Sequence, residues 1–154
     1  MEGQLEHELE VSVPASEVWD VYGGLKLGKL VCELLPNVIE KVELVEGDGG
    51  VGTILKVVFP QGTPGFTFYK EMFTKVDNEK RLKEAEVVEG GYLEFGFSLY
   101  RVRFEIIEKD AKSSIIKTTI EYEVDTATNA SIVSSKALEL IAETIAKYLT
   151  EKQV

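Results

Sequence analysis

The chain has 154 residues, of which 44% are hydrophobic and 29% charged, a composition typical of one globular domain with a substantial core. Its formal net charge of −10 argues against binding to nucleic acid or to anionic membrane surfaces, since both need clustered Lys and Arg. One cysteine and one histidine exclude an internal disulfide and a zinc site. We therefore expect a single domain over residues 1–154, without metal or other cofactor.

The N-terminal part of the chain predicts one strand and two short helices. Apolar and polar residues alternate from Leu5 to Val13, the periodicity of a strand with one buried face. A short helix follows from Ala15 or Ser16 and ends at Gly23-Gly24. A second helix is expected from Leu25 to Leu35, where Pro36 ends it. The first residues lack the basic and apolar regions of a signal sequence and no apolar run could span a membrane, so we expect a cytoplasmic protein.

The middle of the chain predicts six more strands, separated by turns rich in Gly, Pro, Asp and Asn. Their expected ranges are 38–45, 53–59, 66–76, 81–88, 92–107 and 114–124. The fourth and fifth of the seven strands should form a hairpin about Asp77-Asn78-Glu79.

The last segment, Asn129 to Lys152, predicts one long helix capped by Thr128 or Asn129. Its apolar residues recur at steps of three and four and form a single stripe. A long amphipathic helix is marginal alone in water, so the stripe must pack on the strands. We predict an α+β fold in which a curved antiparallel sheet grips this helix and encloses a space.

The segment Gly47-Asp48-Gly49-Gly50-Val51-Gly52 matches the G-x-G-x-x-G pattern of dinucleotide-binding proteins. That chemistry requires a helix N-terminus directly after the glycines, to face the phosphates with free amides. A β-branched strand follows here instead, and no Lys-Ser or Lys-Thr pair is present. We interpret the segment as a tight turn and expect no nucleotide binding.

A tyrosine, a glutamate and a lysine can converge on one side of the predicted hairpin. Tyr69, Glu71 and Phe73 share one face of their strand. If Asn78 centres the turn, Phe73 lies opposite Lys83 and Glu71 is its diagonal neighbour. Spacing alone is more typical of a solvent-facing ion pair than of a buried group. The alternative is a buried lysine with a lowered pKa, which can transfer protons near neutral pH.

Several runs resemble a known family. Glu46-Gly47-Asp48-Gly49-Gly50-Val51-Gly52-Thr53 is similar to the glycine loop of plant pathogenesis-related class ten proteins, the major birch-pollen-allergen superfamily. Four more runs resemble its norcoclaurine synthase branch: Leu34-Leu35-Pro36-Asn37, Phe68-Tyr69-Lys70-Glu71, Val76-Asp77-Asn78-Glu79-Lys80-Arg81-Leu82-Lys83 and Val88-Glu89-Gly90-Gly91-Tyr92-Leu93. The resemblance covers the whole chain. It implies a seven-stranded sheet around the long helix, two short helices beneath, and a hydrophobic cavity between them.

The resemblance also implies residue roles. That branch condenses dopamine with an aldehyde through an iminium ion. Carried over, Lys83 is the general acid/base or carbonyl-polarising group, Glu71 the base for ring deprotonation, and Tyr69 a hydroxyl at the entrance. The branch has an aspartate on the long strand where this chain has Val102. We expect the ligand to contact these residues: Phe73, Tyr100, Val102, Phe104, Leu138 and Ile141.

Two classes of function follow. The first is an enzyme of plant specialised metabolism that takes a small hydrophobic or aromatic aldehyde, by Pictet–Spengler condensation or by cyclisation of a dialdehyde or enol such as an iridoid precursor. The second is a non-catalytic carrier of hydrophobic metabolites or hormones. Retention of Tyr69, Glu71 and Lys83 together favours the enzyme. His7 is interpreted as structural, and the chain as a monomer or a weak homodimer.

Overall fold

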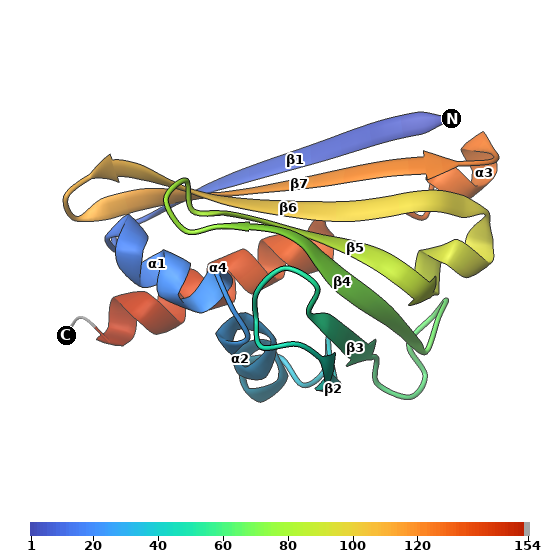
Figure 1. Cartoon of the computed structure of the whole chain (residues 1–154), viewed down its shortest axis with the longest axis horizontal. Helices are drawn as coiled ribbons and strands as arrows, with labels where there is room; N and C mark the ends of the chain where they lie inside the picture. Colours follow the sequence, from blue (N-terminus) through green and yellow to red (C-terminus); the bar gives the residue numbers. More distant parts are fainter. Residues whose placement is uncertain (153–154) are drawn as a thin grey trace.

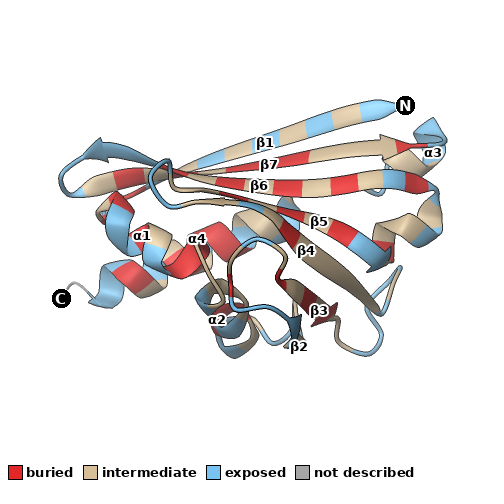
Figure 2. Cartoon of the chain, viewed as in Figure 1, coloured by how far each residue is buried: buried red, intermediate tan, exposed pale blue. Residues whose placement is uncertain are grey.

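A curved antiparallel sheet of seven strands, in the order β1-β7-β6-β5-β4-β3-β2, forms the frame of the protein (Figure 1). The computed structural model describes residues 1–152. The strands are β1 (Glu2–Val11), β2 (Lys41–Glu46), β3 (Ile54–Val58), β4 (Phe68–Asp77), β5 (Leu82–Gly90), β6 (Phe97–Asp110) and β7 (Ser113–Val124). Buried positions recur along β6 and β7 because alternate side chains face the interior (Figure 2).

Helices cover the concave face of the sheet (Figure 1). The covering helices are α1 (Ala15–Tyr22), α2 (Lys26–Leu34) and α4 (Lys136–Lys152). The 3-10 helix η1 (Gly91–Phe95) and α3 (Ala127–Ala130) lie at one end of the sheet, where β6 begins and β7 ends (Figure 1). Helix α4 runs along the sheet and buries Ile141, Ala142, Ile145 and Leu149. The predicted α+β fold, in which the sheet grips the C-terminal helix, is confirmed. Within residues 1–152, no helix has the length and apolarity that crossing a membrane requires.

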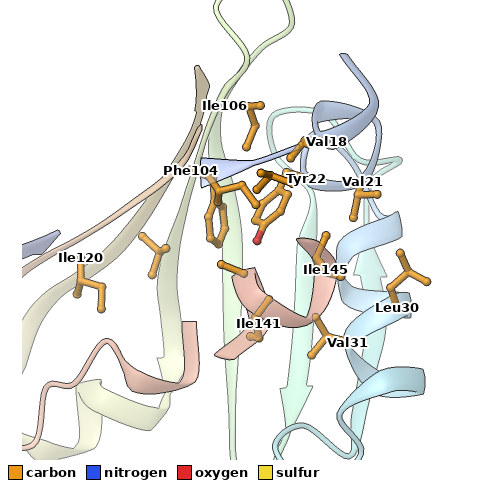
Figure 3. Packing of buried hydrophobic residues seen from close by; sticks show 14 of the residues in the cluster. Val18, Val21, Tyr22, Leu30, Val31, Phe104, Ile106, Ile120, Ile141 and Ile145 are labelled. Atoms are coloured by element: carbon orange, nitrogen blue, oxygen red, sulfur yellow. The ribbon is translucent and has the colours of Figure 1, made fainter. Parts of the chain in front are cut away.

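The core lies where α1, α2 and α4 meet the sheet. Tyr22 of α1 packs edge-on against Phe104 of β6, with ring centroids 5.1 Å apart. Ile141 and Ile145 of α4 lie between this pair and Val31 of α2 (Figure 3). Burying aliphatic side chains of this size contributes about 1.5–3 kcal/mol each, so these contacts fix α4 against the sheet.

The C-terminal helix differs from the prediction of one helix from Asn129. The chain forms α3 first and begins α4 only at Lys136. The predicted caps are also wrong, because Thr126 caps α3 by accepting a hydrogen bond from the Asn129 amide. Ser134 Oγ accepts a hydrogen bond from the Lys136 amide, 3.2 Å away, and this local side-chain contact favours a new helix start over continuation.

The long strand predicted from Tyr92 also begins later. Residues Gly91–Phe95 form η1, and β6 starts at Phe97. Gly91, the first residue of this segment, and Gly96, the residue after it, both have positive φ, at 53° and 83°. These angles are incompatible with an extended strand and favour glycine, so the chain turns before it rejoins the sheet.

The hairpin of β4 and β5 has a different register from the one predicted. Phe73 lies opposite Ala85, and Lys83 lies opposite Val76 rather than Phe73. The register shifts between Phe73 and Lys75, which leaves Thr74 as an extra residue on β4. This β-bulge lets Phe73 and Val76 share the face that carries Lys83, although they are three residues apart.

The glycine segment forms the predicted turn between two antiparallel strands, β2 and β3. Gly47, Gly49 and Gly52 have φ of 94°, 108° and 93°. The Gly49 amide donates to Thr53 Oγ1 at 2.8 Å. One glycine amide of the turn is therefore already occupied by the protein itself.

Candidate functional site

A cavity of about 80 Å³ lies between α2, α4 and the concave face of the sheet; we call it the lysine chamber. A buried water needs about 10–15 Å³ in comparable terms, so the chamber can hold more than a single water. Its walls are mostly aliphatic and aromatic. The residues that line it are Gly24, Leu27, Gly28, Val31, Ile39, Val42, Leu55, Val57, Tyr69, Glu71, Phe73, Lys83, Ala85, Val102, Phe104, Leu138 and Ile141.

Lys83 is the cation of this chamber and is only 3% exposed. Strand β5 directs its side chain inward, and Phe104 is its neighbour across the ladder on β6. The ammonium Nζ lies 4.5 Å from the centroid of the Phe73 ring and 5.6 Å from that of Phe104. Its hydrogen bond, to the Gly24 carbonyl oxygen, is long at 3.4 Å. The ammonium is thus held chiefly between two aromatic faces.

The pKa of Lys83 is lowered from 10.5 to about 8 because burial disfavours the charged amine. The nearby Glu71 carboxylate acts in the opposite direction and limits the decrease. The lysine therefore exchanges its proton close to neutral pH, whereas an exposed lysine stays charged there. Of the two sequence interpretations, the buried lysine is correct and the solvent-facing ion pair is wrong.

Glu71 faces the same chamber from β4, where it pairs with Val87 of β5. Burial raises the pKa of its carboxyl group, and the positive charge of Lys83 partly offsets that increase. The two groups are thus a coupled acid and base whose pKa values burial moves toward each other. Such a pair can deliver a proton to one atom of a ligand and remove a proton from another.

A second cavity, of about 110 Å³, adjoins the first and contains the tyrosines of the site; we call it the tyrosine chamber. Tyr92 and Tyr100 stack there with ring centroids 3.8 Å apart and an interplanar angle of 7°, and their hydroxyls share a hydrogen bond. Burial raises the pKa of Tyr69 and Tyr100 well above 10, so both remain neutral hydrogen-bonding groups. The residues that border both chambers are Ile39, Tyr69, Val102, Leu138 and Ile141.

The structure brings together all the residues that the sequence singled out for the site. Tyr69, Glu71 and Lys83 border the lysine chamber, as do Phe73, Phe104 and the residues shared with the second chamber. Tyr100 borders the tyrosine chamber. Val102, 8% exposed, presents an apolar wall between the two chambers. His7 lies outside them, with Nε2 3.6 Å from the Glu139 carboxylate of α4.

Sequence reasoning missed several residues of the site. Tyr92 was assigned to a regular strand, although the preceding Gly90-Gly91 pair signals the break that places it over Tyr100. Phe59, Phe66 and Ser134 border the tyrosine chamber without any pattern that marks them. Gly24 contributes its backbone carbonyl, and a backbone atom leaves no residue-type signal.

Among residues 1–152, Lys83 and Glu71 are the only side chains lining the lysine chamber that carry a charge in ordinary protonation states. Within residues 1–152, no group of three or more His, Cys, Asp or Glu side chains could hold a metal ion. The Lys83–Glu71 pair offers a ligand acid–base chemistry in an apolar space. Such an environment strengthens the interaction of the ammonium with a polar bond.

Comparison with known proteins places this architecture in a family. Residues 1–152 match the family model described as pathogenesis-related protein Bet v 1 family. The chain belongs to the Bet v 1 family. The predicted resemblance to this family is thereby confirmed, over the full described length of the chain.

Particular members of the Bet v 1 family are similar enough to narrow this placement. The chain is 53% identical to norbelladine synthase from Narcissus pseudonarcissus, with 99% of this chain and 95% of that protein covered. It is 39% identical to S-norcoclaurine synthase 2 from Papaver somniferum, covering 98% of this chain and 67% of the relative. The solved structure of Thalictrum flavum norcoclaurine synthase with dopamine and hydroxybenzaldehyde matches with a TM-score of 0.85 and 38% identity, over 98% and 88% of the two chains. The prediction of a norcoclaurine-synthase-like enzyme is confirmed.

Proposed function

We propose that this protein condenses a small aromatic aldehyde with an aromatic amine, with Lys83, Glu71 and Tyr69 as the reacting side chains. The observation that carries the proposal is the Lys83–Glu71 pair in an apolar chamber, where burial moves the two pKa values toward each other. A carrier of hydrophobic ligands needs the apolar walls of such a chamber. It does not need a coupled acid and base inside it.

The chemistry follows from the two charges. The Lys83 ammonium donates a hydrogen bond to the aldehyde oxygen, which makes the carbonyl carbon more electrophilic. Attack by the amine and loss of water then give an iminium ion. The Glu71 carboxylate takes the proton that the substrate must release, either from nitrogen or from the ring carbon at which a new ring closes. Tyr69 borders both chambers, and in the proposal its neutral hydroxyl donates a hydrogen bond to the substrate.

Two adjoining chambers suit two aromatic substrates. In the proposal the aldehyde occupies the lysine chamber, within reach of Nζ, and the ring of the amine packs among Phe66, Tyr92 and Tyr100 in the tyrosine chamber. The bond then forms near Tyr69 and Val102, where the chambers adjoin. Dopamine and hydroxybenzaldehyde, found together in the similar Thalictrum flavum enzyme, are an aromatic amine and an aromatic aldehyde, the two classes of substrate assigned to the two chambers.

Val102 sets a limit on the amine. A carboxylate at this position would attract the ammonium of an incoming amine, and a valine cannot. We therefore propose slow turnover of dopamine, and keep cyclisation of a dialdehyde or enol, such as an iridoid precursor, as the second candidate. Both are lyase or cyclase reactions at the same lysine.

The cytoplasmic location, the single-domain organisation and the monomeric or weakly dimeric state also stay predictions.

The proposal is tested by incubating the protein with dopamine and hydroxybenzaldehyde and following product by chiral chromatography. We expect condensation above the buffer rate with one enantiomer in excess, and a rate lowered by about 10²–10⁴-fold in Glu71→Gln. The matched control is Glu89→Gln, which removes a carboxylate on the neighbouring strand that pairs instead with Lys70. Binding of both compounds without any product above the buffer rate would contradict the proposal and leave the carrier function.

A further inference from the structure

The nitrogen of Lys83 is weakly held for a buried ammonium. Its hydrogen bond to the Gly24 carbonyl is 3.4 Å long, at the far end of the usual range. Among residues 1–152, no carboxylate oxygen forms a salt bridge with it within 4.0 Å. The remaining contacts are the faces of Phe73 and Phe104. A tight salt bridge would lock the proton on nitrogen, and this arrangement does not.

We propose that Lys83 is also a nucleophile, and that it forms a covalent imine with an uncharged aldehyde in the lysine chamber. This inference rests on the proposed function, because it concerns the same chamber and the same aldehyde. Amines that react in this way are those desolvated in apolar pockets, which keep a fraction of the nitrogen unprotonated near neutral pH. The burial of Lys83 and the apolar lining of its chamber supply that condition.

The step needs no oxidant or reductant. The nitrogen lone pair of neutral Lys83 attacks the carbonyl carbon, so that an N–C bond forms and the π bond of the carbonyl breaks onto oxygen. Glu71, acting through one water because no carboxylate oxygen of the described residues lies within 4.0 Å of Nζ, carries the two nitrogen protons to that oxygen in turn. The first proton converts the alkoxide to the hydroxyl of the carbinolamine, and the second is added to this hydroxyl. That hydroxyl leaves as water while the C=N bond forms. Amine and aldehyde thus give imine and water, with Glu71 restored.

The surroundings of Nζ fit the product as well as the free lysine. When the neutral imine takes up a proton from solvent, its positive charge lies at the same nitrogen, between the Phe73 and Phe104 rings that already face the ammonium. Its counter-charge is Glu71, whose carboxylate interacts with Lys83 through space. The cation formed is therefore stabilised by groups already in place.

The same walls restrict the aldehyde. Apart from Lys83 itself, the described residues that line the lysine chamber offer no cation to bind a carboxylate. A keto acid or aldehyde acid would lose its hydration without gaining a partner, which is unfavourable for a buried charge. An aromatic aldehyde finds apolar walls for its ring. Exchange with the amine substrate would then transfer the carbon to that amine and release Lys83.

Reductive trapping tests the proposal directly. The protein is incubated with hydroxybenzaldehyde and sodium cyanoborohydride, which converts an imine to a stable secondary amine, and is then measured by intact mass spectrometry and peptide mapping. We expect one adduct per chain, on Lys83, formed at least ten-fold faster than on surface lysines. The rate should rise as the pH increases through about 8, where Lys83 loses its proton. It should fall in Glu71→Gln, because the proton carrier is lost.

Two variants make the outcome decisive. Lys83→Arg keeps a cation but removes the nucleophile, so the fast adduct should disappear from a protein that circular dichroism shows to be folded. Lys70→Met removes a lysine that is paired with Glu89 on β5, and should leave the fast adduct unchanged. Adducts spread over many lysines, or a fast adduct that persists in Lys83→Arg, would overturn the proposal.

Failure here is distinguishable from failure of the condensation itself. If no fast adduct forms but stereoselective turnover still depends on Lys83, the lysine acts by proton transfer alone and the covalent step is wrong. If turnover is also absent, the proposed function has failed as well. Recovery of turnover by Lys83→Arg would likewise show that a cation suffices and that no imine with the enzyme is needed.

Discussion

Replacement of Lys83 by methionine should separate its chemical role from its effect on stability. The pKa decrease from 10.5 to about 8 means that the charged lysine destabilises the folded state by about 3 kcal/mol at neutral pH. Lys83→Met keeps the aliphatic stem and removes that penalty. In the variant Glu71 loses its counter-charge, and this loss offsets part of the gain in folding stability. With ~2–4 °C per kcal/mol for a chain of this length, we expect Tm to rise by about 3–8 °C.

The pH dependence identifies the cause. Between pH 8 and 10.5 the folded protein has released the Lys83 proton while the unfolded chain still binds it. The unfolded state then binds more protons, so wild-type stability increases with pH in this window. Lys83→Met has no such term, and its advantage should narrow as the pH rises from 8 toward 10.5. Tyrosine titration affects both proteins and largely cancels in the difference.

The assay pairs chemical denaturation at several pH values with turnover of the aldehyde and amine. Turnover should fall by about 100-fold or more, the loss typical of removing a general acid or base. A folded Lys83→Met variant with wild-type turnover would refute the catalytic role. A stability difference that stays constant from pH 7 to 10 would refute the assignment of the penalty to a buried charge.

Three further changes test other parts of the site. Glu71→Gln should lower turnover by about 10²–10⁴-fold. It should also lower the pKa of Lys83 below about 8, because the Glu71 carboxylate of the wild-type protein raises that pKa; NMR of the lysine methylene carbons measures it. Val102→Asp should raise the pKa of Lys83, lower Tm, and increase dopamine turnover; unchanged turnover in a folded variant would show that a carboxylate there is not what the amine lacks. Gly49→Val should destabilise the protein by about 1–2 kcal/mol in denaturant titrations, because φ is 108° there, and calorimetry with ATP or NAD should give no saturable heat for either protein. Submillimolar nucleotide binding that is lost in Gly49→Val would contradict the interpretation of this segment as a turn.

Periodicity alone was sufficient to predict the frame of the protein. The alternation from Leu5 to Val13 and the steps of three and four after Val133 are properties of single segments, and each segment must bury its apolar side. The seven strands, the two short helices and the C-terminal helix follow from those local patterns. The boundaries of the elements were less predictable. The start of α4 depends on one hydrogen bond to Ser134, and the late start of β6 depends on the positive φ of Gly91.

The candidate site required the tertiary structure. Strand parity placed Tyr69, Glu71 and Lys83 on one face, but parity cannot say whether that face meets water or protein. The answer depends on the curvature of the sheet, on the bulge at Thr74 and on α4 lying across the concave side. Burial, and with it the lowered pKa of Lys83, arises from atoms that are distant in sequence. A residue pattern specifies which groups can react, and only the packing around them sets their protonation and reach.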